Sequence, residues 1–261
     1  MNRYFIYLSY NGANYHGWQR QPNGISVEET VERALTLVLG RNIDIVGAGR
    51  TDAGVNATSM PAHFDYAGEL PSLTPLTAGR TPERQLQFKL NRMLPPDIAV
   101  EKIVRVRDEA HARFDAVERT YHYYITTKKS PFRAAHYFRI PFDIDVDKMN
   151  EAAKYLVKRG DFASFAKTHS DVKTTICDVR RAEWVDLGDC AWRFEITADR
   201  FLRNMVRAVV GTLLDVGRGR MKPSDMENVL ADCDRRAAGE SVFGGALFLY
   251  EVKYPQSVFE Y

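Results

Sequence analysis

Apolar positions recur along this 261-residue chain with periods that alternate between those of strands and those of helices. The first part predicts strands over residues 4–10, 43–46, 62–66 and 98–106, and helices over residues 27–39 and 82–94. Ser26 and Glu29 form a capping box before the first helix, and Gly40 ends it. The order β-α-β-β-α-β is that of the split βαβ, ferredoxin-like arrangement.

The second part of the chain repeats this order. It predicts a strand over residues 120–126, a helix capped by Asp147, and strands over 177–187 and 191–198 around a turn at Gly188. A strongly apolar helix over residues 201–214 follows, then a short helix with a capping box at Ser224, and a last strand over 247–254. We therefore expect an α+β protein of two ferredoxin-like (βαββαβ) halves, residues 1–107 and 108–261, with antiparallel or mixed sheets and a cleft between them.

Composition narrows the class of protein. Apolar residues make up 45% of the chain, and 36 Lys and Arg face 34 Asp and Glu, so the net charge is only +2. A disordered tail or a histone-like binder is excluded, and a nucleic-acid partner would need a local basic surface. The three cysteines form no C-x-x-C pair, and no apolar run approaches the roughly 20 residues that span a bilayer. These features predict a cytoplasmic protein with no membrane contact.

The most unusual segment is the glycine-rich loop 47–55. A dinucleotide fingerprint fails there because Asp52 stands where the third glycine would be, and a carboxylate repels a pyrophosphate. An ion pair between Arg50 and Asp52 would lower the pKa of the carboxyl group and keep it ionised, ready to act as a nucleophile or a base. The same spacing also fits a turn with a surface ion pair.

Three other segments carry basic or aromatic residues. Arg203 and Arg207 stand four apart on the expected apolar helix, which suits a phosphate or carboxylate partner, although both side chains can also reach solvent. Basic and aromatic residues interleave around His111, Arg113 and Tyr121, and again in residues 14–21, as in surfaces that contact phosphates and stack bases. A strand with several tyrosines is equally typical of ordinary sheet packing.

Cofactor motifs are missing from the sequence. The six histidines form no H-E-x-x-H pair, and neither a zinc-deaminase pattern nor a P-loop nor a G-x-S-x-G elbow occurs. We expect neither a metal nor an organic cofactor.

Taken in order, these segments resemble the TruA family of tRNA pseudouridine synthases. The resemblance rests on blocks that run over nearly the whole chain: residues 10–21 (YNGANYHGWQRQ), 48–55 (AGRTDAGV), 94–100 (LPPDIAV), 111–114 (HARF), 119–121 (RTY), 161–165 (DFASF) and 201–207 (FLRNMVR). The sequence departs from the family pattern at Asn56, at residues 58–61, and in a longer loop over 68–80.

The resemblance implies isomerisation of uridine to pseudouridine at positions 38 to 40 of the tRNA anticodon stem-loop, without a cofactor. It also implies a homodimer, with tRNA spanning both subunits, and a basic cleft between the two halves. A non-catalytic RNA-binding module and a pseudouridine synthase for another RNA site remain alternatives.

Residue roles follow from the same resemblance. Asp52 matches the catalytic aspartate. The sequence does not decide whether this aspartate attacks the sugar, adds to the uracil ring or abstracts a ribose proton. Tyr121 matches the tyrosine that stacks on the target uracil and helps deprotonate C5, Arg203 an arginine that pairs with Asp52 or a phosphate, and Arg50 one that helps extrude the nucleotide. The expected substrate-binding residues are Tyr121, His111, Arg113, Arg207, Arg20 and Gln19.

Overall fold

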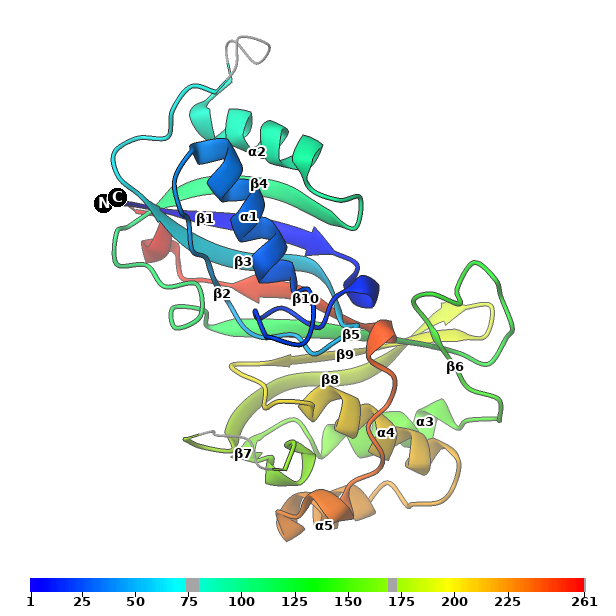
Figure 1. Cartoon of the computed structure of the whole chain (residues 1–261). Helices are drawn as coiled ribbons and strands as arrows, with labels where there is room; N and C mark the ends of the chain where they lie inside the picture. Colours follow the sequence, from blue (N-terminus) through cyan, green and yellow to red (C-terminus); the bar gives the residue numbers. More distant parts are fainter. Residues whose placement is uncertain (74–79, 169–172, 261) are drawn as a thin grey trace. The chain divides into compact units, whose positions relative to one another are not determined.

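The computed structural model describes residues 1–73, 80–168 and 173–260, and the chain forms two compact units (Figure 1). Unit 1 comprises Met1–Val117 and Leu249–Tyr261, and unit 2 comprises Glu118–Phe248. These units differ from the expected halves 1–107 and 108–261, because the C-terminal segment returns to unit 1. There Val117 N donates to Lys253 O at 2.9 Å, and Arg107 N donates to Val258 O at 3.1 Å. Of the expected loop 68–80, residues 74–79 lie outside the described residues.

Unit 1 is built on antiparallel strand pairs. Its strands are β1 (Asn2–Tyr10), β2 (Val46–Gly47), β3 (Asn56–Tyr66), β4 (Ile98–Val106) and most of β10 (Leu247–Lys253). The order is β4-β1-β3-β10, with β1 antiparallel to both β3 and β4, and β2 also pairs with β3. Helix α1 (Val27–Leu39) crosses β1 and β3, with α2 (Pro82–Met93) beside it (Figure 1). The 3₁₀ turns of this unit are η1 (Gly12–Asn14) and η6 (Gln256–Phe259).

Local sequence signals explain much of unit 1. Ser26 Oγ accepts from Glu29 N at 3.2 Å, and Gly40 takes the left-handed conformation with φ 68°, so α1 has the predicted bounds. The predicted strand over 43–46 is wrong: only Val46–Gly47 pair, and the next strand begins at Asn56 rather than at residue 62. One core cluster joins β1, β4 and the C-terminal segment through Phe5, Tyr7, Val106, Ala110, Ala112 and Val258.

Unit 2 combines a second set of strands with three helices. Its strands are β5 (Glu118–Thr126), β6 (Phe138–Arg139), β7 (Arg159–Asp161), β8 (Ile176–Gly188) and β9 (Ala191–Ala198). The antiparallel order is β5-β9-β8-β7, and β6 pairs with β5 in parallel. The helices are α3 (Val146–Lys154), α4 (Met205–Gly217) and α5 (Asp225–Asp232), with 3₁₀ turns η3 (Ala163–Phe165), η4 (Arg235–Ala237) and η5 (Gly244–Ala246). Nearly all of α4 is buried.

Three helix starts differ from prediction. Helix α3 is capped by Asp145, whose Oδ1 accepts from Lys148 N at 3.0 Å, and not by Asp147. Helix α4 begins at Met205 instead of residue 201, because Asn204 before it is left-handed with φ 68°. The expected capping box at Ser224 is wrong, since this residue has helical φ and ψ and its side chain makes no cap hydrogen bond.

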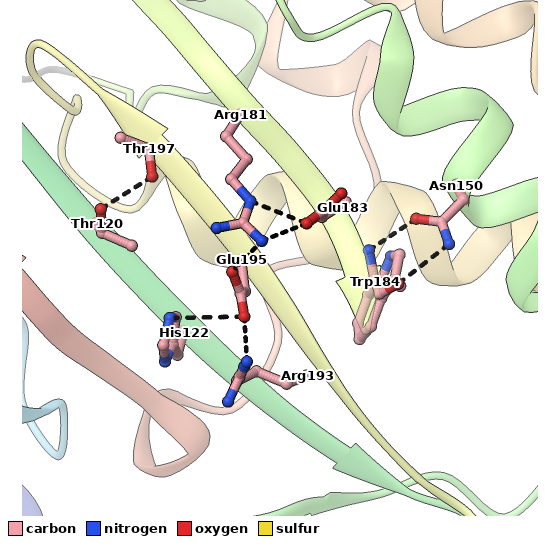
Figure 2. Close-up of polar contacts among 9 residues, drawn as sticks. All are labelled: Thr120, His122, Asn150, Arg181, Glu183, Trp184, Arg193, Glu195 and Thr197. Atoms are coloured by element: carbon pink, nitrogen blue, oxygen red, sulfur yellow. Dashed lines mark hydrogen bonds and ion pairs between the residues drawn. The ribbon is translucent and has the colours of Figure 1, made fainter. Parts of the chain in front are cut away.

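One side of the β5-β9-β8 strands carries a cluster of polar residues (Figure 2). Buried Glu195 pairs with Arg181 at 2.7 Å and with Arg193, and His122 Nε2 lies 4.0 Å from its carboxylate. Burial first, and the Arg193 charge second, lower the pKa of His122 to about 4. Asn150 of α3 bonds both the N and the O of Trp184, at 2.7 and 3.1 Å, and so ties that helix to β8 (Figure 2).

The predicted α+β class is confirmed, with five helices in the described residues and mostly antiparallel strands. Within those residues, no helix is long and apolar enough to cross a membrane.

Candidate active site

The loop that carries Asp52 joins β2 to β3 in unit 1 and is held at its backbone. Ala48 N donates to Pro61 O at 2.8 Å, where the loop leaves the sheet. Further along, Trp18 N donates to Thr51 O at 3.1 Å, and Gly54 N donates to Tyr15 O at 3.3 Å. Segment 15–18 therefore holds the chain on either side of Asp52. Asp52 itself is half-buried.

Two glycines let the N-terminal segment approach this loop. A Cβ on Gly17, where φ is 90°, would lie 2.5 Å from Thr51 O. A Cβ on Gly12 would lie 2.1 Å from Val55 O. At contacts this short, a side chain on either glycine would force the neighbouring backbone to shift. The sequence block around residues 10–21 is thereby explained as the support of the Asp52 loop, a role that no spacing in the sequence revealed.

Side chains complete the support. Tyr10 Oη and Thr51 Oγ1 lie 2.8 Å apart in a buried hydrogen bond, one residue before Asp52. Asn56, 1% exposed, accepts from Gly12 N at 2.9 Å through its Oδ1. The departure from the family pattern at position 56 is therefore a structural contact inside unit 1.

Arg50 does not pair with Asp52. Within the described residues, the Arg50 guanidinium has no carboxylate within 4.0 Å and no hydrogen-bond partner, and the residue is exposed. The ion pair expected from the two-residue spacing is thus wrong for this structure.

The expected substrate residues Gln19 and Arg20 lie in the segment before α1 and have different environments. Arg20 Nη2 pairs with Glu32 Oε2 at 2.7 Å, and the Arg20 N–H donates to Glu28. Burial raises the pKa of Glu32, while a hydrogen bond from Ile45 N opposes that shift. Gln19 is exposed. Arg20 therefore helps anchor the segment to α1, and Gln19 lies at the surface.

His111 and Arg113 lie in a separate turn of unit 1. His111 Nδ1 accepts from Arg113 N at 3.1 Å, so in its neutral form the ring carries its proton on Nε2. Burial first, and the charge of Arg3 second, lower the pKa of His111. Behind it, buried His63 accepts from Ala112 N at 3.1 Å, and the two imidazole rings lie 4.6 Å apart. His63 thus holds this turn in place through Ala112 and His111, while Arg113 stays exposed.

The other expected residues belong to unit 2. Tyr121 of β5 is half-buried and meets Phe201 edge to face, with ring centroids 5.1 Å apart. Arg203 lies in the turn before α4 and not on the helix, and its carbonyl accepts from Lys167 N at 3.0 Å. Arg207, in the first turn of α4, donates from Nε to Val242 O at 2.7 Å. The expected single helix face bearing both arginines is therefore wrong.

Metal ligands do not gather in the described residues: no group of three His, Cys, Asp or Glu side chains there could hold an ion.

Comparison with known proteins defines the class. A family model described as tRNA pseudouridine synthase matches residues 152–255. The chain is 53% identical over 260 residues to a protein named "tRNA pseudouridine synthase A" from Bacteroides fragilis, covering 100% of this chain and 99% of that one. The namesake from Bacillus licheniformis is 38% identical over 251 residues, covering 95% and 97%.

The chain belongs to the tRNA pseudouridine synthase A family. A solved structure entitled "Crystal Structure of a Cbf5-Nop10-Gar1 Complex" covers 80% of this chain and 54% of its own, at 10% identity. Its TM-score of 0.32 is too low to support a conclusion.

Proposed function

We propose that this protein converts uridine to pseudouridine in the anticodon stem-loop of tRNA, at positions 38 to 40, with Asp52 as its essential carboxylate. Membership of the family makes it an enzyme, a tRNA-modifying isomerase. The observation that supports Asp52 is its place in a loop whose backbone is held on both sides by segment 15–18. A rigidly held carboxylate suits a reaction that depends on the position of one acid.

The reaction needs no external reactant. The bond from ribose C1′ to uracil N1 breaks, a bond from C1′ to C5 forms, C5 loses a proton and N1 gains one, so the atoms balance within the nucleotide. Asp52 acts by attack on the sugar, by addition to the ring or by removal of a ribose proton. Tyr121 stacks on the uracil and assists proton loss from C5, and its edge-to-face contact with Phe201 supports a fixed ring.

The arginines act on the polyanionic substrate. Arg50 helps to extrude the target nucleotide, a step that costs a few kcal/mol, and its exposure and lack of a partner in the described residues suit this task. Arg203 pairs with Asp52 or with a phosphate. The proposal assigns further substrate contacts to His111, Arg113, Arg207, Arg20 and Gln19. Of these, Arg20 already pairs with Glu32, and Arg207 already donates to Val242 O.

The proposal further includes two ferredoxin-like halves around a basic cleft and a homodimer. It also includes modification of tRNA in the cytoplasm. The order β4-β1-β3 with β2 also beside β3, and β1 antiparallel to both neighbours, supports the split βαβ arrangement for unit 1.

The decisive experiment compares wild type with Asp52→Asn on unmodified tRNA transcripts, mapping pseudouridine by carbodiimide and primer extension. We expect modification at positions 38 to 40 by wild type and a loss on the order of 10²–10⁴-fold if Asp52 is a base, or more if it is a nucleophile. Affinity for tRNA should stay within a few fold. Asp44→Asn, an exposed aspartate of the same unit, is the matched control.

Three results would contradict the proposal. Full activity of Asp52→Asn would remove Asp52 from the mechanism, and pseudouridine only outside the anticodon stem-loop would identify another RNA site. Tight tRNA binding without any modification by wild type would leave a binding module.

A further inference from the structure

Residues 127–140 of unit 2 form a basic segment that the proposed active-site residues do not include. It follows β5 and contains Lys128, Lys129, Arg133 and Arg139, with no aspartate or glutamate. At its tip, Phe132 is 95% exposed, the largest exposed fraction among the large apolar side chains of the described residues. A phenylalanine in this position loses contact with water only when something binds it.

The turn between β8 and β9 fixes one side of the basic segment. The Asp189 carboxylate pairs with Lys128 and, at 3.3 Å, with Arg133, whose Nη1 also donates to Asp189 O at 2.9 Å. Thr127 N donates to Cys190 O at 3.1 Å. Asp189 and Cys190 both adopt left-handed φ, 50° and 54°, a conformation that persists where surrounding contacts enforce it.

Aromatic packing fixes the other side. Arg133 lies over the Tyr137 ring at 5.4 Å, and Tyr137 packs on Tyr124 of β5 with centroids 5.2 Å apart. Ile140 N donates to Thr126 O at 2.8 Å and returns the chain to the sheet. The tip is therefore presented from an ordered base, and a rigid surface loses less conformational entropy when it binds.

Charge decides which partner suits this surface. Asp189 neutralises part of Lys128 and Arg133, whereas Lys129 and Arg139 are exposed and, in the described part of the chain, lie within 4.0 Å of no carboxylate. A basic segment that also carries an exposed aromatic ring matches a chain of phosphates with accessible base faces. A second copy of this segment would bring like charges together.

We propose that the basic segment is an additional RNA-binding surface, on which Phe132 stacks against an unpaired base of the tRNA while Lys129 and Arg139 contact phosphates. This inference rests on the proposed function, because the RNA concerned is the substrate. It adds a contact distinct from the residues assigned to the reaction, so it governs affinity rather than the chemical step.

The test uses full-length protein and measures the Kd for an unmodified tRNA transcript at several stated salt concentrations. Phe132→Ala should weaken binding by about 5- to 150-fold, the range for loss of one stacked base, and Phe132→Trp should retain it. Lys129→Gln should reduce the slope of log K against log salt by about 1. Leu37→Ala, which truncates an apolar side chain 67% exposed on α1, is the matched control and should bind like wild type.

Single-turnover modification at saturating protein should be unchanged in Phe132→Ala. If wild type forms pseudouridine while Phe132→Ala binds tRNA as tightly as wild type, the inference is wrong and the proposed function stands. If wild type modifies no tRNA, the proposed function fails, and the Kd values still decide the inference. Sedimentation gives a further check. If wild type is an oligomer that Phe132→Ala disrupts, and the variant binds RNA like wild type at protein concentrations that restore the oligomer, the surface is a protein contact and the inference is overturned.

Discussion

Replacing Gly17 by alanine tests whether segment 15–18 positions the Asp52 loop. The new Cβ would lie 2.5 Å from Thr51 O, whereas ordinary contact begins at 3.4 Å, so the Thr51 carbonyl must withdraw by about 0.9 Å (3.4 − 2.5). The atoms in the way are backbone atoms of Thr51, Asp52 and Ala53, which cannot turn aside as a flexible side chain does. The strain must therefore pass into the loop that carries the carboxylate.

The expected effect falls on the rate of the chemical step. A displacement near 1 Å of a catalytic group lowers the rate by about 10²-fold, and left-handed φ on a non-glycine residue costs about 1–3 kcal/mol of stability. Gly40→Ala separates the two effects, because Gly40 also has positive φ, 68°, but a Cβ there has no atom within 4 Å. Gly40→Ala should therefore be less stable than wild type and should keep the wild-type rate.

The assay is single-turnover release of tritium from tRNA labelled at uracil C5, with unfolding followed by circular dichroism and tRNA affinity measured in parallel. We expect Gly17→Ala to be folded, to bind tRNA and to react slowly, with Gly40→Ala reacting at the wild-type rate. Equal rates for folded Gly17→Ala and Gly40→Ala would refute the idea that this contact positions Asp52.

Two further predictions follow from buried polar groups. Tyr10→Phe removes the hydroxyl that bonds Thr51 Oγ1, so the free energy of unfolding should fall by about 1–3 kcal/mol and kcat should fall with KM unchanged. The control is Tyr4→Phe, because the Tyr4 hydroxyl bonds no described residue. An equal kcat for both variants would count against a role of the Tyr10–Thr51 hydrogen bond. Burial lowers the pKa of His63 from 6.5 to about 4, so the unfolded chain binds the proton more tightly. The stability that neutral His63 contributes is present above pH 6.5 and is lost as the pH falls towards 4, by at most about 3 kcal/mol; urea unfolding should show a smaller loss in His63→Gln, and identical pH profiles would contradict this.

Elements with strong local signals could be predicted from the sequence. Helix α1 has the predicted bounds because Ser26 and Gly40 act on neighbouring backbone groups, and β4 has them because Pro95 and Pro96 separate it from α2. The start of β3 differs from the predicted one, since Pro61 lacks an N–H and a proline argues against a strand in a sequence pattern. Pairing with β1 nevertheless includes it, opposite Tyr7.

Helix α4 shows how tertiary contacts override an apolar pattern. Its apolar run extends back to Phe201, yet the Phe201 ring packs edge to face on Tyr121 of β5, and Asn204 turns left-handed before the first helical residue. Arg203 consequently leaves the helix face on which the pattern had placed it.

The sequence alone determined the α+β class, helix α1 with its caps, and the motifs that indicated a tRNA pseudouridine synthase, because these depend on residues close together in the chain. Only the tertiary structure decided that Arg50 and Asp52 do not pair, and that Tyr10, Gly12 and Gly17 support the Asp52 loop. Those contacts join segments more than 30 positions apart, and their geometry depends on how β1 and β3 align, which no local periodicity encodes.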